Sequence, residues 1–309
     1  MLALLAGCGS EPQPPMRVGA VLWPGNESLF FAAARGWLAP RDFRMVETSS
    51  GFEAIRGFRN GTLDAASLTY DEVIRAMQDG SQPVVLIALD ESHGADAVLA
   101  RPGIAALTAL RGRRVGLQVN SVSAYLLRRA LESAGMRSED IEVVNVAPEL
   151  HQAYLERGDV DAVATYEPFK SHLLEHGVIE LFDSTAIPGE IGDVLVVRRD
   201  YAEAHPERAA ALHQAWRRAR AEAAGPAATA QAAKRLGVPP AVLVRMLTGL
   251  TVLDAPANRA AWQTQRQRLA ASMSAIQGRL AAAGLISKQF PMAPLFDWPA
   301  ALTARVWQD

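Results

Sequence analysis

The sequence of 309 residues contains a single cysteine, Cys8, and this scarcity excludes two kinds of site. One cysteine cannot build an intrachain disulfide framework or a cysteine-based metal centre. Basic and acidic residues nearly cancel, with 31 Lys and Arg against 33 Asp and Glu. The chain therefore lacks the basic excess that is typical of proteins that bind nucleic acid or an anionic membrane surface.

Common catalytic signatures are missing as well. The sequence has no G-x-S-x-G, no G-x-x-x-x-G-K-[ST], no G-x-G-x-x-G and no H-E-x-x-H. His172 and His176 are four residues apart, as two metal ligands on one helix face would be, but no third ligand is recognisable nearby. We therefore expect no catalytic residue, no metal and no cofactor, and we do not expect an enzyme.

The start of the chain has the pattern of a bacterial lipoprotein signal. The apolar residues Leu5-Ala6-Gly7 precede Cys8, and residues 9–15 are rich in Pro and polar side chains. After Cys8 no apolar run approaches the ~20 residues that span a bilayer. Residues 1–16 are predicted to be a signal and tether, with Cys8 lipidated and the lipid as the sole membrane attachment.

Two stretches of the chain repeat each other. Arg17-Val18-Gly19 recurs as Arg114-Val115-Gly116, and each copy opens a predicted strand, loop and helix. The run from Gly61 to Ala66 follows the first copy after 44 positions, and the similar run from Gly158 to Val163 follows the second after the same interval. Two matches in the same order and at equal spacing predict two similar α/β units.

Short apolar runs alternate with helical patterns in both units. We expect α/β units with mostly parallel sheets and helices on both faces, that is, two doubly wound lobes joined by a hinge. Residues 17–100 and 194–309 are predicted to form lobe one, with the C-terminal third as a helical extension, and residues 101–193 form lobe two. Predicted strands cover residues 18–22, 43–47, 63–68, 84–89 and 97–100, then 115–119, 141–146, 160–164, 178–182 and 192–198.

Ligands of open α/β sheets bind beyond the carboxyl ends of the strands. Residues expected there from lobe one are Trp23, Glu27, Ser50, Tyr70, Asp71 and Asp96, and from lobe two Ser121, Ser123, Tyr125, Tyr166 and Glu167, with Asp193 at the return crossing. Structural roles stay open for several of them. Trp23 is also consistent with a buried core side chain at a strand end, and Ser121 and Ser123 with helix N-caps. Asp71 and Glu167 are also consistent with acids in the first turn of a helix, where the helix dipole favours them.

Several runs resemble one protein family. They are the stretch from Trp23 to Ala66, the run Gly94-Ala95-Asp96 with residues 97–104, residues 110–116, and residues 187–198. Over residues 17–199 the chain resembles solute-binding components of ABC importers of the nitrate, sulfonate and taurine type, a family that includes binders of thiamine pyrimidine precursors. The resemblance implies the type II periplasmic binding protein fold, a periplasmic monomer that grips a small solute between its lobes, and delivery to a membrane permease and its ATPase.

The predicted loops are acidic. They contain Glu27, Asp71, Asp96 and Glu167, with Asp193 nearby, whereas an oxyanion is usually held by Arg, Lys or several N–H donors. This count favours a cationic or N–H-rich solute such as an amine, amidine or aminopyrimidine. Three alternatives are a nitrate or sulfonate binder of the same family, a ligand-sensing partner of a membrane receptor, and a pyrimidine-synthesis enzyme of the same fold.

Overall fold

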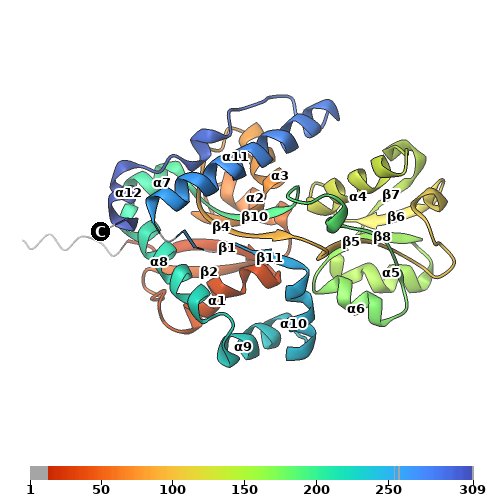
Figure 1. Cartoon of the computed structure of the whole chain (residues 1–309), viewed down its shortest axis with the longest axis horizontal. Coiled ribbons are helices and arrows are strands. Elements are labelled where there is room, and N and C mark those ends of the chain that lie inside the picture. Colours follow the sequence, from red (N-terminus) through yellow and green to blue (C-terminus); the bar gives the residue numbers. More distant parts are fainter. Residues whose placement is uncertain (1–12, 254, 257, 308–309) are drawn as a thin grey trace, which may run out of the picture.

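The computed structural model describes residues 13–253, 255–256 and 258–307, so the predicted signal and Cys8 lie outside the described residues. These residues form two sheets that lie side by side (Figure 1). The first has the order β11-β4-β10-β3-β1-β2. Its strands are β1 (Met16–Val21), β2 (Phe43–Thr48), β3 (Ala65–Thr69), β4 (Pro83–Ser92), β10 (Gly192–Arg198) and β11 (Leu250–Val252).

The second sheet has the order β7-β6-β8-β5-β9. Its strands are β5 (Asp96–Ala100), β6 (Arg114–Leu117), β7 (Glu142–Asn145), β8 (Ala162–Tyr166) and β9 (Ile179–Asp183). In both sheets three neighbouring strands are parallel, β2-β1-β3 and β7-β6-β8, and the strands that cross between the halves, β10 and β5, are antiparallel to them. Mixed sheets of this kind confirm the predicted α/β class.

Helices cover both faces of each sheet (Figure 1). In the first half these are α1 (Glu27–Ala34), α2 (Gly51–Arg59), α3 (Tyr70–Gln78) and the C-terminal α7 (Arg199–Ala204), α8 (Pro206–Glu222), α9 (Pro226–Leu236), α10 (Pro240–Thr248), α11 (Arg259–Ala282) and α12 (Ala300–Val306). In the second they are α4 (Val122–Ser133), α5 (His151–Arg157) and α6 (Phe169–Glu175). Within the described ranges no helix is long and apolar enough to cross a membrane.

One predicted boundary is wrong. The strand at residues 97–100 was expected in lobe one, but β5 pairs with β8 and β9 and belongs to the second sheet. The chain therefore crosses between the sheets at residues 93–95, where Gly94 has a φ of 109°. It returns just before Gly192, close to the predicted position. Sheet membership fixes these crossings, whereas the division into two hinged lobes stays a prediction.

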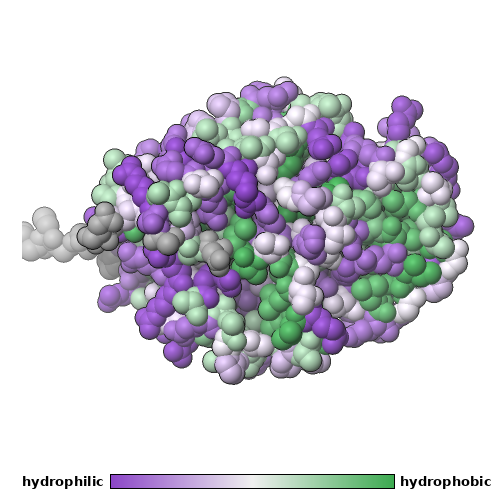
Figure 2. Space-filling view, viewed as in Figure 1, coloured by the Kyte–Doolittle hydropathy of each residue, from purple (hydrophilic) through white to green (hydrophobic). Residues whose placement is uncertain are grey.

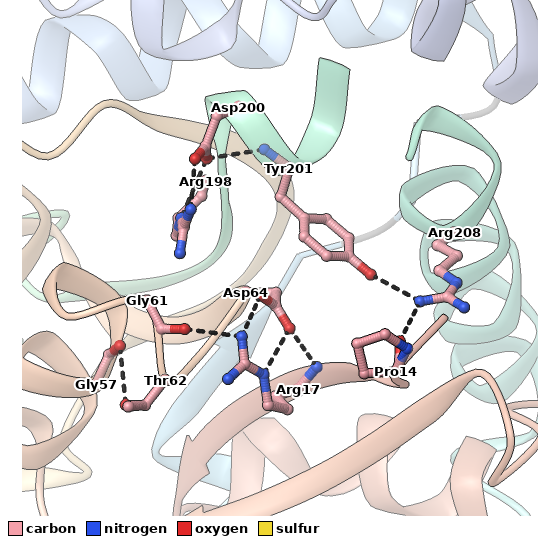
Figure 3. Close-up of polar contacts among 10 residues, drawn as sticks. All are labelled: Pro14, Arg17, Gly57, Gly61, Thr62, Asp64, Arg198, Asp200, Tyr201 and Arg208. Atoms are coloured by element: carbon pink, nitrogen blue, oxygen red, sulfur yellow. Dashed lines mark hydrogen bonds and ion pairs between the residues drawn. The ribbon is translucent and has the colours of Figure 1, made fainter. Parts of the chain in front are cut away.

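A set of polar contacts, here called the latch, joins the amino ends of neighbouring strands in each repeat, and Figure 3 shows the latch of the first repeat. The Arg17 backbone N–H donates to Asp64 Oδ2 at 2.8 Å, and its guanidinium donates to Asp64 Oδ1 and to the Gly61 carbonyl, both at 2.7 Å. In the second half the Arg114 backbone N–H donates to Asp161 Oδ2 at 3.1 Å, and its guanidinium donates to the Gly158 carbonyl at 2.5 Å. The sequence repeat thus corresponds to a repeated set of contacts.

We expect Asp64→Asn to lower the free energy of unfolding by about 2 kcal/mol, because Asp64 is 4% exposed and accepts several N–H bonds that an amide satisfies poorly. The matched control is Asp79→Asn, since Asp79 pairs with Arg59 on the surface with 43% of its side chain exposed. That change should cost less than about 0.5 kcal/mol. Urea denaturation measures both, and equal losses would contradict a structural role for the latch.

Candidate functional site

A small cavity lies between the two sheets. Its lining comes from both halves of the chain: Val21, Trp23, Gly51, Ser67, Thr69 and Glu72 from the first, Asp96, Gln118, Ser121, Val122 and Tyr166 from the second, and Ile191 and Asp193 from the return crossing. Val21, Thr69 and Tyr166 end the parallel strands β1, β3 and β8, which is the edge where open α/β sheets bind ligands. The cavity holds about 30 Å³, enough for little more than water.

The turn after β1 places Trp23 at this cavity. Pro24 starts a 3-10 turn that leads into α1, and the buried Asn26 side chain donates to the Val21 carbonyl at 3.1 Å and accepts from Ser67 Oγ at 2.7 Å. Asn26 thus ties the turn to β1 and β3, and its side chain makes no cap bond to α1.

Trp23 is held by a buried carboxyl. Its indole N–H donates to Asp90 at 3.2 Å (Oδ1) and 3.4 Å (Oδ2), and Asp90 is fully buried. Gly25 leaves room for this carboxyl, since a Cβ there would sit 1.8 Å from Asp90 Oδ2. The Trp23 ring meets Tyr166 edge to face with centroids 6.1 Å apart, so one aromatic contact joins the two halves across the cavity.

Three acidic side chains line the cavity, and no Arg or Lys is among the lining residues that the structure describes. Glu72, Asp96 and Asp193 are at most 5% exposed. Asp96 Oδ2 has no hydrogen-bond partner among the described residues. Burial raises the pKa of Asp96 and of Glu72 to about 7, and burial together with the nearby Asp90 carboxyl raises the pKa of Asp193 well above its usual range.

Two helices begin at the same cavity. Ser50 Oγ accepts from Glu53 N–H at 3.1 Å and caps α2, and Ser121 Oγ accepts from Ser123 N–H at 3.3 Å and caps α4. Gly51 and Val122, the first residues of these helices, line the cavity. First-turn N–H groups have no acceptor within their own helix, and together with the helix dipole they attract anions. The cavity thus combines anion-attracting N–H groups with buried carboxyls.

The structure places five of the twelve predicted ligand residues in the cavity lining: Trp23, Asp96, Ser121, Tyr166 and Asp193. Ser50 adjoins it through Gly51. Ser123 is fully buried at the start of α4, and its Oγ has no hydrogen-bond partner in the described part of the chain.

The other five predicted residues lie outside the lining because each has an internal partner. Tyr70 Oη donates to Glu91 at 3.1 Å, and Tyr125 Oη donates to Glu190 at 2.6 Å. Glu27 pairs with Arg235 at 3.1 Å. Asp71 accepts from Thr69 Oγ1 at 2.7 Å, and Glu167 accepts from Ser171 Oγ at 2.8 Å and its N–H at 3.0 Å. Direct ligand contact for these five stays a prediction.

Sequence reasoning missed Glu72, Ser67 and Gln118 in the lining, and Asp90 beneath Trp23. Glu72 had a readable signal, because Thr69 followed three residues later by Glu is a capping pattern. The Thr69 N–H does donate to Glu72 Oε2 at 3.0 Å. Asp90 had no readable signal in the sequence, because its partner Trp23 is 67 residues away in the chain.

The chain belongs to the NMT1-like family, whose model matches residues 9–237. It is 28% identical over 162 residues to the taurine-binding periplasmic protein of Escherichia coli K12, covering 51% of this chain and 50% of that protein. It is 30% identical over 161 residues to a putative aliphatic sulfonates-binding protein of the same organism, again covering 51% and 50%. The chain thus matches about half the length of each of these relatives.

Solved structures show the same fold. The alkanesulfonate-binding protein of Xanthomonas axonopodis pv. citri bound to MOPS aligns with a TM-score of 0.75 at 21% identity, over 92% of this chain and 98% of that one. The desulfurization enzyme DSZB aligns with a TM-score of 0.68 at 16% identity, over 95% and 99%. The predicted periplasmic binding protein fold is therefore confirmed.

Asp96→Asn should become more stabilising as the pH rises. Burial raises the pKa of Asp96 to about 7 in the folded chain, whereas an unfolded Asp loses its proton at about pH 4. Between these pH values only the folded chain holds the proton, so the free energy of unfolding of wild type falls as the pH rises to 7. We expect the stability of Asp96→Asn relative to wild type to grow by on the order of 2 kcal/mol between pH 5 and 8.

Thermal and urea unfolding across this pH range measure the difference between the two proteins. Burial lowers the pKa of His151 to about 4 and that of His213 to about 3. Both histidines affect the pH dependence of stability equally in wild type and variant, so their effect cancels in the difference between the two proteins. A difference that stays flat with pH would contradict a buried, proton-binding Asp96.

Proposed function

We propose that this protein is the extracytoplasmic solute-binding component of an ABC importer for small organosulfonates. The relatives that carry taurine and aliphatic sulfonates in their names support the solute class, and the fold supports capture between two lobes. The single observation that carries the proposal is the cavity between the sheets, which receives two helix starts, Gly51 and Val122, from opposite halves of the chain.

The solute that suits this cavity best carries one negative and one positive group. The sequence favoured a cation or an aminopyrimidine from the acid count, and the relatives do not support that preference. Helix N–H groups at Gly51 and Val122 suit a sulfonate, and Asp96 and Asp193 suit an ammonium group. An aminoalkanesulfonate satisfies both sides, because its ammonium group favours the ionised form of the buried carboxyls, whereas a plain anion gives them no cationic partner.

The sheets must separate to admit such a solute. A free volume of about 30 Å³ is too small for an organosulfonate, so we propose that the two halves move apart when the solute enters. The two crossings, at residues 93–95 and just before Gly192, are the places where a hinge would bend. The proposed lobes are therefore residues 16–92 with 192–307, and residues 96–191.

We infer a binding role without catalysis, with release of the solute to a permease and its ATPase. The named binding proteins among the relatives support it, although one structural neighbour of the same fold is an enzyme. The apolar residues before Cys8 and the Pro-rich polar residues after it support a lipid attached at that cysteine. Metabolic labelling with a palmitate analogue, compared between wild type and Cys8→Ser, tests the anchor.

Calorimetry with taurine and ethanesulfonate tests the solute class. Ethanesulfonate keeps the sulfonate and lacks the ammonium group, so we expect taurine to bind at least about 10-fold more tightly. Asp193→Asn should weaken taurine binding by about 10-fold and leave ethanesulfonate unchanged or slightly tighter. Asp159→Asn is the matched control, because Asp159 is half-exposed and pairs with Arg157 away from the cavity.

Two results would overturn this assignment. Binding of 4-aminopyrimidine with no binding of either sulfonate would restore the cationic class. Equal affinities for taurine and ethanesulfonate in wild type and Asp193→Asn would leave the sulfonate class intact and remove the carboxyls from recognition.

A further inference from the structure

A second cavity lies on the other side of the turn that carries Trp23. Pro24 and Gly25 of that turn line it, together with residues of α1, α8, α9, α10 and β11. Its volume is about 230 Å³, several times that of the cavity between the sheets. The cavity is partly open to solvent, and its size within the helical part of the first half makes it a candidate binding site.

Its walls are apolar apart from a few groups. Phe31, Leu243, Leu247 and Val252 supply large apolar surfaces, and five alanines of α8, α9 and the segment between them supply small ones. Figure 2 shows hydrophobic surface at the lower centre of the molecule, in the region where Figure 1 places α10. On α10, Val244 is 55% exposed. An aqueous or highly charged solute is poorly matched to such walls, and a compact apolar body is well matched.

Polar ties hold the walls apart. Glu27 of α1 pairs with Arg235 of α9 at 3.1 Å, and Arg235 also pairs with Glu47 at 2.8 Å. Gln231 of α9 donates to the Phe30 carbonyl at 3.2 Å. These contacts fix α9 on α1 at a set distance, so the alanine surfaces of Ala228 and Ala232 cannot close the space by collapse.

Glu27 is one of the polar residues that line the cavity, together with Ser28, Arg220 and Thr229. It lines the cavity, it is 6% exposed, and its two oxygens share the single Nε–H of Arg235 at 3.2 and 3.1 Å. A carboxylate offers about four lone-pair positions, so acceptor capacity remains on the cavity side. An occupant with one N–H donor would add a further hydrogen bond to this carboxylate.

We propose that this cavity is an accessory binding site for a small, mostly apolar molecule with one N–H donor, of the size of a bicyclic heteroaromatic. A 150 Å³ cavity lined by apolar side chains binds benzene, and 230 Å³ has room for a second fused ring. The ring system packs against Phe31, Leu243 and the alanines, and the N–H donates to Glu27. The site is independent of the proposed sulfonate function.

Indole and indene are the probes, because they share a shape and only indole has an N–H. Calorimetry on the full chain should show indole binding at submillimolar to millimolar concentration and indene binding about 10-fold more weakly. Ala228→Leu fills the cavity and should weaken indole binding at least 10-fold. Ala230→Leu, on the exposed side of the same helix, is the matched control and should bind indole as wild type does.

Circular dichroism and thermal unfolding establish that each variant is folded, and Ala232→Val replaces Ala228→Leu if that variant is not. Saturating taurine should leave indole binding unchanged, since the two cavities are separate. Displacement of indole by taurine, undiminished binding in the filled variant, or no binding up to the solubility limit of indole would each overturn the proposal. Equal binding of indole and indene would overturn the role given to Glu27.

Discussion

The bond between the Trp23 indole and the buried Asp90 carboxyl sets the geometry around which both cavities are built. It fixes a bulky side chain at the end of β1, and that side chain meets Tyr166 of the opposite half. The same turn presents its other side, Pro24 and Gly25, to the accessory cavity. The arrangement tolerates no side chain at Gly25, because Asp90 occupies the space that a Cβ would need.

Buried carboxyls are the second constraint on this molecule. Asp90, Asp96 and Asp193 lie close enough for each to disfavour ionisation of the others, and burial adds to the effect. A site of this kind is costly when it is charged and empty, and a ligand that brings a positive group relieves the cost. The helix starts at Gly51 and Val122 offer the opposite preference a short distance away. The cavity therefore offers partners both to a positive group, through its carboxyls, and to a negative group, through the helix N–H groups. This combination is unusual for a site that binds a simple anion.

Much of the fold could be predicted from the sequence because it depends on local signals. Apolar runs, Pro-Gly breaks and helix stops such as Gly158 are readable one residue at a time, and the equal spacing of Arg17–Gly61 and Arg114–Gly158 revealed the repeat. The strand at 97–100 was placed in the wrong sheet because periodicity finds a strand and says nothing about its partners. Its register with β8 depends on residues more than 60 positions away.

The site was predictable only in outline, for the same reason. Acids at the ends of strands could be found, but whether each faces the ligand depends on long-range partners. Glu27 is paired with Arg235, 208 positions away, and Tyr125 with Glu190, 65 positions away. No local pattern distinguishes these from Asp96, whose second oxygen has no hydrogen-bond partner within the described residues. Tertiary pairing, rather than residue type, decides which acid is left for a solute.

The latch of Arg17 and Asp64 lies at one end of β1, and the cavity lies at the other, four residues or about 13 Å further along the strand. Each half thus separates the contacts that hold it together from the proposed binding residues. Loops at the recognition end can change their residues without disturbing the contacts that secure the strands. Such a division lets one scaffold acquire new specificities at little risk to its integrity, and it makes these loops the natural place to redesign the protein as a sensor for other small molecules.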